Sequence, residues 1–205
     1  MKQRICQMLL VATAGASLLG GCAPLVVGGA VVGGMVAVDR RTSGTQLEDE
    51  AIELKVSSAI GRELGDRVHL NVTSYNRRVL LTGEVASEAD RSRATSLAQS
   101  QENVKEVIND LAIGASSSFS QRTKDGITTG QVKAAFVDAK DLQASAVKVV
   151  TERGIVYLMG RVTPREAQRA TDIARSTGGV VKVVRVFEEI SEQELQRLSQ
   201  PPLSR

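Results

Sequence analysis

The spacing of apolar residues predicts a helix and two strands at the point where the chain first shows a regular pattern. Over residues 52–64 an apolar residue recurs every four positions, as on the buried face of an amphipathic helix. Apolar and polar residues then alternate over residues 68–73, which is the period of a half-buried strand, and residues 79–85 are expected to form the returning strand. The polar segment at residues 75–78 predicts a turn, so the two strands form a hairpin.

A second helix and a third strand are expected after the hairpin. Ser87 is a favourable N-cap residue, and Asp90 stands three positions later, where a carboxylate favours the start of a helix. This helix is expected to end near Gln101, and residues 103–113 supply the third strand. The order of elements is therefore α-β-β-α-β.

This pattern occurs twice, because part of the sequence is repeated. Val79, Leu81, Gly83 and Val85 recur 77 residues later as Val156, Leu158, Gly160 and Val162. Further pairs at an offset of 76 or 77 extend the match from Val72 to Val107. A register that holds across helices and strands indicates a tandem duplication.

The second copy carries the same signals. Residues 132–137 are expected on its first helix, and residues 145–151 and 155–162 form its hairpin. The sequence Thr163-Pro164-Arg165-Glu166 gives an N-cap, a proline at N1 and a glutamate at N3, which predicts the start of the second helix. The last strand covers residues 180–190.

The sequence thus predicts an α+β protein with two tandem domains, residues 47–114 and 123–190. Each domain is expected to hold a three-stranded mixed sheet covered by two helices. Residues 115–122 are expected to form a linker, and residues 191–205 a tail with one or two helical turns at 192–198.

The N-terminus has the plan of a lipoprotein signal. Lys2 and Arg4 precede an apolar stretch that ends in Leu19-Gly20-Gly21-Cys22, which resembles the bacterial lipobox. We therefore expect a signal peptide at residues 1–21, lipid attachment at Cys22 and a Gly-rich tether at residues 22–46. Residues 23–38 include four glycines, which favours a tether over a transmembrane helix. By the sorting rule that the lipobox resemblance implies, Ala23 favours the outer membrane, with the protein facing the periplasm.

Composition argues against catalysis and against nucleic acid. Aromatic residues make up 2% of the chain, so base stacking on aromatic side chains is not expected. One histidine and two cysteines exclude His-rich or Cys-rich metal sites and a disulfide framework. His69 alternates outward on its predicted strand and has no second histidine, so no metal or acid–base role is expected for it. The sequence predicts no catalytic pair, no metal site and no cofactor.

The repeated unit resembles the BON domain. The likeness rests on the α-β-β-α-β order, the strand ends Gly83-Glu84-Val85 and Gly160-Arg161-Val162, and the later Val104-Lys105-x-Val107. Two such units behind a lipobox are similar to the DolP family of outer-membrane lipoproteins. Stretches such as Ile127-Thr128-Thr129 and Val156-Tyr157-Leu158-Met159-Gly160 carry that more specific resemblance.

This resemblance implies a role at the outer membrane. Members of the family support outer-membrane integrity, are found at the division site, bind anionic phospholipids such as phosphatidylglycerol and cardiolipin, and are linked to the barrel-assembly machinery. Their lipid surface is the first helix of the second BON unit, which corresponds here to residues 127–140. The predicted phospholipid-binding residues are Ile127, Val132, Lys133, Phe136, Val137, Lys140 and Lys148. Where the family helix can begin with an interfacial tryptophan, this chain has Gly126.

Three alternatives stay open at this stage. Val132 and Phe136 can instead be core residues of their own domain, which is the favoured interpretation for these two. Residues 47–114 contain 12 acidic and 8 basic side chains and residues 122–190 contain the reverse. A basic second unit suits docking on anionic headgroups, but the two units can also attract each other. A protein adaptor or chaperone acting on barrel assembly is the alternative function.

Overall fold

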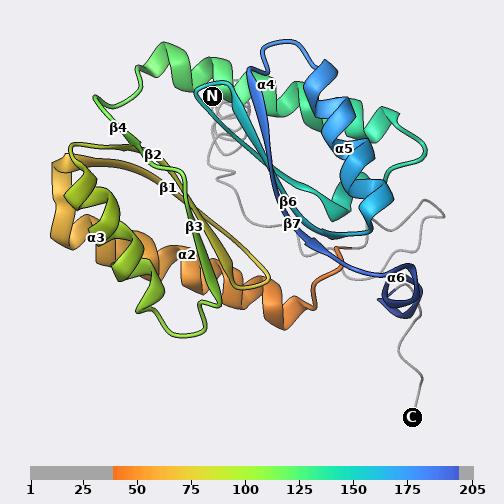
Figure 1. Cartoon of the computed structure of the whole chain (residues 1–205), viewed down its shortest axis with the longest axis horizontal. Coiled ribbons are helices and arrows are strands. Elements are labelled where there is room, and N and C mark those ends of the chain that lie inside the picture. Colours follow the sequence, from red (N-terminus) through yellow and green to blue (C-terminus); the bar gives the residue numbers. More distant parts are fainter. Residues whose placement is uncertain (1–38, 199–205) are drawn as a thin grey trace, which may run out of the picture. The chain divides into compact units, whose positions relative to one another are not determined.

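Two copies of one α-β-β-α-β motif make up the described part of the chain, residues 39–198 of a computed structural model (Figure 1). The first copy consists of α2 (Ser43–Leu64), β1 (Val68–Tyr75), β2 (Arg78–Val85), α3 (Glu88–Gln99), β3 (Glu106–Asn109) and β4 (Ala112–Ile113). The second consists of α4 (Phe119–Asp138), β5 (Lys148–Glu152), β6 (Ile155–Val162), α5 (Pro164–Ser176) and β7 (Lys182–Glu189), and α6 (Glu192–Leu198) follows. The predicted order of elements and the α+β class are confirmed. The predicted signal peptide and Cys22 lie outside the described residues.

Each copy builds one mixed sheet around its second strand. In the first domain, β2 pairs antiparallel with β1 and parallel with β3, and the short β4 extends the parallel side. In the second domain, β6 pairs antiparallel with β5 and parallel with β7. The antiparallel pair is the predicted hairpin, and the helix between the second and third strands makes the parallel crossover. No helix within residues 39–198 is long and apolar enough to cross a membrane.

An aspartate on the first helix of each domain fixes the hairpin turn. Asp49 accepts hydrogen bonds from the amides of Asn76 and Arg77, at 2.8 and 2.7 Å. Its equivalent, Asp125, accepts from the amides of Arg153 and Gly154, both at 2.8 Å. All four turn residues have positive φ, which is the geometry of a tight two-residue hairpin. A buried carboxylate therefore joins helix and hairpin at the same point of both repeats.

The repeated glycine of the second strand allows a close backbone contact. A Cβ atom at Gly83 would lie 2.0 Å from the carbonyl oxygen of His69, and one at Gly160 would lie 2.3 Å from that of Ala146. Gly83 also has a φ of +116°, which a residue with a side chain rarely adopts. The glycine of the Gly83-Glu84-Val85 motif is therefore required by the backbone of the neighbouring strand.

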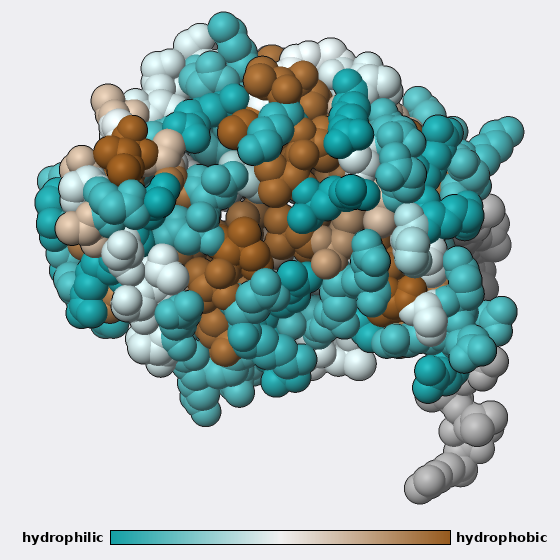
Figure 2. Space-filling view, in the orientation of Figure 1, coloured by the Kyte–Doolittle hydropathy of each residue, from teal (hydrophilic) through white to brown (hydrophobic). Residues whose placement is uncertain are grey.

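The two faces of each sheet have different partners. In β2, Val79, Leu81 and Val85 pack with α2 and α3 in the core of the first domain. Leu80 points to the opposite face, where it joins Tyr157 and a third cluster of residues from both domains. The remaining buried members of that cluster are Tyr75, Met159 and Val186. The helices of each domain lie on the outer side of its sheet (Figure 1), and apolar side chains between β3 and β7 reach the surface seen in Figure 2.

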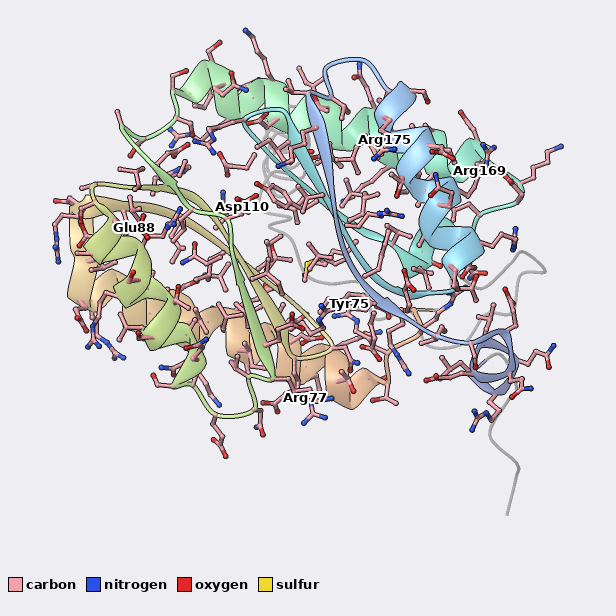
Figure 3. The ribbon with its side chains drawn as sticks, in the orientation of Figure 1. Tyr75, Arg77, Glu88, Asp110, Arg169 and Arg175 are labelled. Atoms are coloured by element: carbon pink, nitrogen blue, oxygen red, sulfur yellow. The ribbon has the colours of Figure 1, made fainter. Side chains whose placement is uncertain are left out.

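Polar contacts surround this interdomain cluster. The Tyr157 hydroxyl donates to Asp110 at 2.8 Å, and Arg78 donates to the Phe187 carbonyl at 2.8 Å. Figure 3 shows Asp110 and Tyr75 on the inner side of the first domain, whereas Arg169 and Arg175 lie on α5. The Arg40 guanidinium reaches Glu166 at the start of α5, at 2.6 and 2.8 Å, and both side chains are almost fully buried. The segment before α2 thus contacts the second domain as well as the first.

Several boundaries differ from the sequence prediction, and three of the differences have a clear local cause. Helix α2 begins at Ser43, because Thr42 provides an N-cap ahead of the apolar repeat. Helix α4 begins at Phe119, inside the segment predicted as a linker, since Ser118 caps it. The third strand of the first domain is shorter than residues 103–113 and is interrupted at Asp110 and Leu111. The Asn109 side chain accepts the Leu111 amide at this interruption, which replaces a ladder hydrogen bond.

Candidate functional site

Helix α4 carries most of the predicted phospholipid-binding residues, and the structure separates them by face. Ile127 and Val137 are 58% and 72% exposed on the outer side of the helix. Lys133 and Lys140 are also exposed, Lys140 just beyond the helix end. These four residues therefore form one accessible surface.

The other three predicted residues do not belong to that surface. Val132 and Phe136 are 0% and 1% exposed in the core of the second domain, so they cannot touch a membrane while the domain is folded. The core alternative holds for both residues, because helical periodicity places them on the face opposite Ile127. Lys148 is directed at the first domain, where its amine donates to Glu53 at 2.8 Å and to the Ser74 carbonyl at 3.2 Å. Its predicted headgroup role is replaced by an interdomain ion pair.

The outer side of α4 has an apolar stripe that includes a residue the sequence prediction missed. Phe119 is 78% exposed, more than either Ile127 or Val137. Together with the exposed Ala134, these residues follow one another at helical spacing, and we call the four of them the α4 stripe. Phe119 was overlooked because it lies in the predicted linker, although Ser118 and Gln121 have the spacing of a capping box.

Basic side chains border the α4 stripe. Lys124, Lys133 and Lys140 are exposed, and their side chains make no hydrogen bond or ion pair within residues 39–198. Arg122 is also exposed, and one guanidinium nitrogen lies 3.3 Å from Nε2 of His69. The three lysines are therefore free to approach an anion. An apolar stripe beside free cations is the arrangement found in helices that bind membrane surfaces.

A cleft between the domains lies beneath α4. It has a volume of about 430 Å³ and is lined by β1, β5 and the inner side of α4 around Asp125 and Thr129. His69 and Glu84 are cross-strand neighbours there, and His69 Nδ1 lies 2.8 Å from Glu84 Oε2. Glu152 enters from the second domain and accepts a hydrogen bond from Asn71 at 2.7 Å.

These three side chains could together hold a metal ion. One ligand atom from each of His69, Glu84 and Glu152 lies within 4.8 Å of the others. Burial raises the pKa of Glu152, the hydrogen bond from Asn71 lowers it, and the charge of Glu84 raises it further, so that its pKa lies above its ordinary value. His69 does point away from the core of its own domain, as its strand position predicts, but the second domain covers that face. The sequence offered no sign of this, because Glu152 lies in the other repeat.

Comparisons with known proteins agree with the duplicated fold. The BON domain family matches residues 48–115 and again residues 124–189. The outer membrane lipoprotein DolP of Haemophilus influenzae is 44% identical over 172 residues, which cover 82% of this chain and 89% of that protein. A protein named 21 kDa hemolysin from Actinobacillus pleuropneumoniae is 34% identical over 152 residues, covering 73% of this chain and 78% of its own.

The solved structures that match this chain include CdsD, a structural protein of the type III secretion system of Chlamydia trachomatis, with 12% identity and a TM-score of 0.30. The match covers 73% of this chain and 98% of that one.

Proposed function

The chain belongs to the BON domain family and, within it, to the DolP lipoproteins, and on this premise we propose that it is a lipid-anchored envelope protein whose second domain binds anionic phospholipid through α4. The α4 stripe, bordered by three lysines that have no partner within the described residues, is the observation that carries the proposal. Phosphatidylglycerol and cardiolipin have the charge that these lysines would bind.

Each part of this surface contributes a modest free energy. A lysine near an anionic membrane surface is worth about 1 kcal/mol, so Lys124, Lys133 and Lys140 together supply a few kcal/mol. The apolar side chains add about 25 cal/mol for each Å² that leaves water. Binding with a free energy of this magnitude is reversible, as is typical of helices that lie at the membrane interface.

A covalent anchor would make such weak binding effective. In this proposal Cys22 carries the acyl chains in the outer membrane and the two domains face the periplasm, as the name of the Haemophilus relative suggests. Tethering raises the local concentration of α4 at the membrane, so that each encounter becomes intramolecular. The anchor then supplies residence on the membrane, and α4 sets which face of the protein lies against the lipid.

Vesicle flotation tests the proposal on the chain from residue 37 onward, which forms one compact unit without Cys22. This fragment is expected to float with phosphatidylglycerol vesicles and not with phosphatidylcholine vesicles. Ile127→Glu should lower the fraction bound by about tenfold, because it removes apolar contact and adds a repelled charge. Leu54→Glu is the matched control, since Leu54 is 71% exposed on α2.

Two outcomes would count against this function. If the folded fragment floats with neither vesicle type, α4 is not a phospholipid surface, and the protein-adaptor alternative takes its place. If Ile127→Glu and Leu54→Glu weaken binding equally, the whole protein rather than α4 is responsible. Circular dichroism of each variant shows whether it is folded.

A further inference from the structure

The interdomain cleft brings together two carboxylates that come from different domains and are both almost fully buried. Glu84 and Glu152 are each 3% exposed. Gly83 permits the close approach of β2 to the backbone of His69, which sets Glu84 directly beside the imidazole. Glu152 ends β5 and reaches the same point from the second domain.

Among residues 39–198, only one oxygen of each carboxylate finds a hydrogen-bond partner. Glu84 Oε2 interacts with His69 and with the Ser117 amide, at 2.8 and 3.1 Å, and Glu152 Oε2 interacts with Asn71. The Oε1 atoms of both glutamates are buried and have no hydrogen-bond partner among the described residues. Buried polar atoms are nearly always paired in folded proteins, so each of these two oxygens needs a further partner, such as a cation or a water.

The arginines beside the two glutamates donate no hydrogen bond to these two oxygens. Arg153 Nε lies 3.8 Å from Glu84 Oε1, beyond hydrogen-bond distance, and the Arg153 side chain is 35% exposed. Arg122 approaches the far side of the imidazole. Arg153 can therefore turn into solvent when a stronger cation enters. Two carboxylates this close otherwise repel each other.

We propose that His69, Glu84 and Glu152 form a Zn²⁺ site that joins the two BON domains. One imidazole nitrogen and two carboxylate oxygens make a ligand set that Zn²⁺ accepts, with a water from the cleft as the fourth ligand. Ca²⁺ and Mg²⁺ prefer oxygen ligands only, so the imidazole selects against them. The hydrogen bonds to Glu152 from Asn71 and to Glu84 from Ser117 would orient the two carboxylates.

A cation here would also affect α4, because Asp125, Gly126 and Thr129 of that helix line the same cleft. Two of the three ligands belong to the first domain and the third to the second. Binding would therefore hold the domains together at the inner side of the helix that carries the α4 stripe, and would stabilise the folded chain by mass action.

Calorimetric titration with Zn²⁺ tests the site on the chelator-treated chain from residue 37 onward, which lacks both cysteines. We expect one Zn²⁺ per chain and a rise in the melting temperature. Glu152→Gln should bind at least tenfold more weakly, and Arg153→Gln more tightly, because it removes the competing cation. Glu53→Gln is the control, since Glu53 also bridges the domains but lies outside the cluster.

The imidazole provides an independent readout, because His69 is the only histidine of the chain. Its ring resonances should shift on addition of one equivalent of Zn²⁺ to the wild-type protein, and not in Glu152→Gln. Failure of the wild-type protein to bind Zn²⁺ would overturn the proposal. So would binding that leaves the ring resonances in place or that Glu152→Gln does not weaken, because the metal would then lie elsewhere.

Discussion

Helices α2 and α4 occupy the same position in the two repeats, and their buried faces are more alike than their outward faces. At an offset of 76 residues, Asp49 corresponds to Asp125, and both carboxylates hold the hairpin turn. Ile60 corresponds to Phe136, and both side chains are fully buried. The fold thus constrains these positions in both copies, since each must pack on its own sheet.

The outward faces have diverged in charge. Glu48, Glu50 and Ser57 of α2 correspond to Lys124, Gly126 and Lys133 of α4. Both helices still expose large apolar residues, such as Leu54 on α2 and Ile127 on α4. The difference between the repeats is therefore mainly electrostatic on their outer surfaces, which is where a duplicated domain can acquire a new partner without loss of its fold.

The largest effects are expected where the two helices are alike. Phe136→Ala should lower the free energy of unfolding by about 3–5 kcal/mol, because it leaves a cavity in the core of the second domain. Ile60→Ala should lower it by about 2–5 kcal/mol at the equivalent position of the first domain. Urea denaturation measures both. If Phe136→Ala abolished flotation but left stability unchanged, Phe136 would be a lipid contact and its core position would be contradicted.

The next effect concerns the contact between the segment before α2 and the second domain. Glu166→Gln should lower the free energy of unfolding by about 3 kcal/mol, because it leaves the buried Arg40 guanidinium without its charged partner. Burial alone raises the pKa of Glu166, but the bonds from Arg40 and Thr163 outweigh it and hold that pKa below its ordinary value.

The pH dependence of this contact follows from the lowered pKa. The stabilisation by ionised Glu166 is fully present above the ordinary glutamate pKa. It is lost as the pH falls toward the lower pKa that Glu166 has in the folded protein. The unfolding free energy of the wild-type protein should therefore fall more steeply between about pH 5 and pH 2 than that of Glu166→Gln. If the unfolding free energies of the two proteins fell equally steeply with decreasing pH, the ion pair would contribute nothing to stability.

The smallest effects come from exchanging one residue between the outward faces. Lys133→Ser should weaken binding to phosphatidylglycerol vesicles by about fivefold, because one lysine near the membrane surface contributes about 1 kcal/mol of binding free energy. Ser57→Lys should strengthen binding by less, because α2 still carries the acidic residues Glu48 and Glu50. Neither change should alter stability by more than about 0.5 kcal/mol, since both positions are exposed. Equal and opposite effects would mean that net charge alone determines binding.

Much of the fold could be predicted because its signals are local. The N-cap at Ser87 and the capping box of Thr163 and Glu166 lie where the sequence indicates. The first hairpin follows from the alternation over residues 68–73 and the turn after it, and the duplication follows from a constant offset. These features depend on neighbours a few residues apart, which a single sequence displays directly.

The site could be predicted only in part, because periodicity shows which residues share a face but not what covers it. Ile127 and Phe136 lie on opposite faces of the same predicted helix, and packing on the sheet decides which of these faces is buried. Lys148 was predicted to meet a headgroup, whereas Glu53 of the other domain is its partner. His69 likewise comes close to Glu152 only because the two sheets pack together, and no spacing along the chain predicts this contact.

The comparison between the two helices can be tested directly with a single fluorophore, because the chain contains no tryptophan. Ile127→Trp places one on α4, and Leu54→Trp places one at a similarly exposed position on α2. With phosphatidylglycerol vesicles, the emission of Ile127→Trp should shift to shorter wavelength while that of Leu54→Trp stays unchanged. Neither should respond to phosphatidylcholine. A shift for Leu54→Trp alone, or for neither protein, would contradict the assignment of the phospholipid surface to α4.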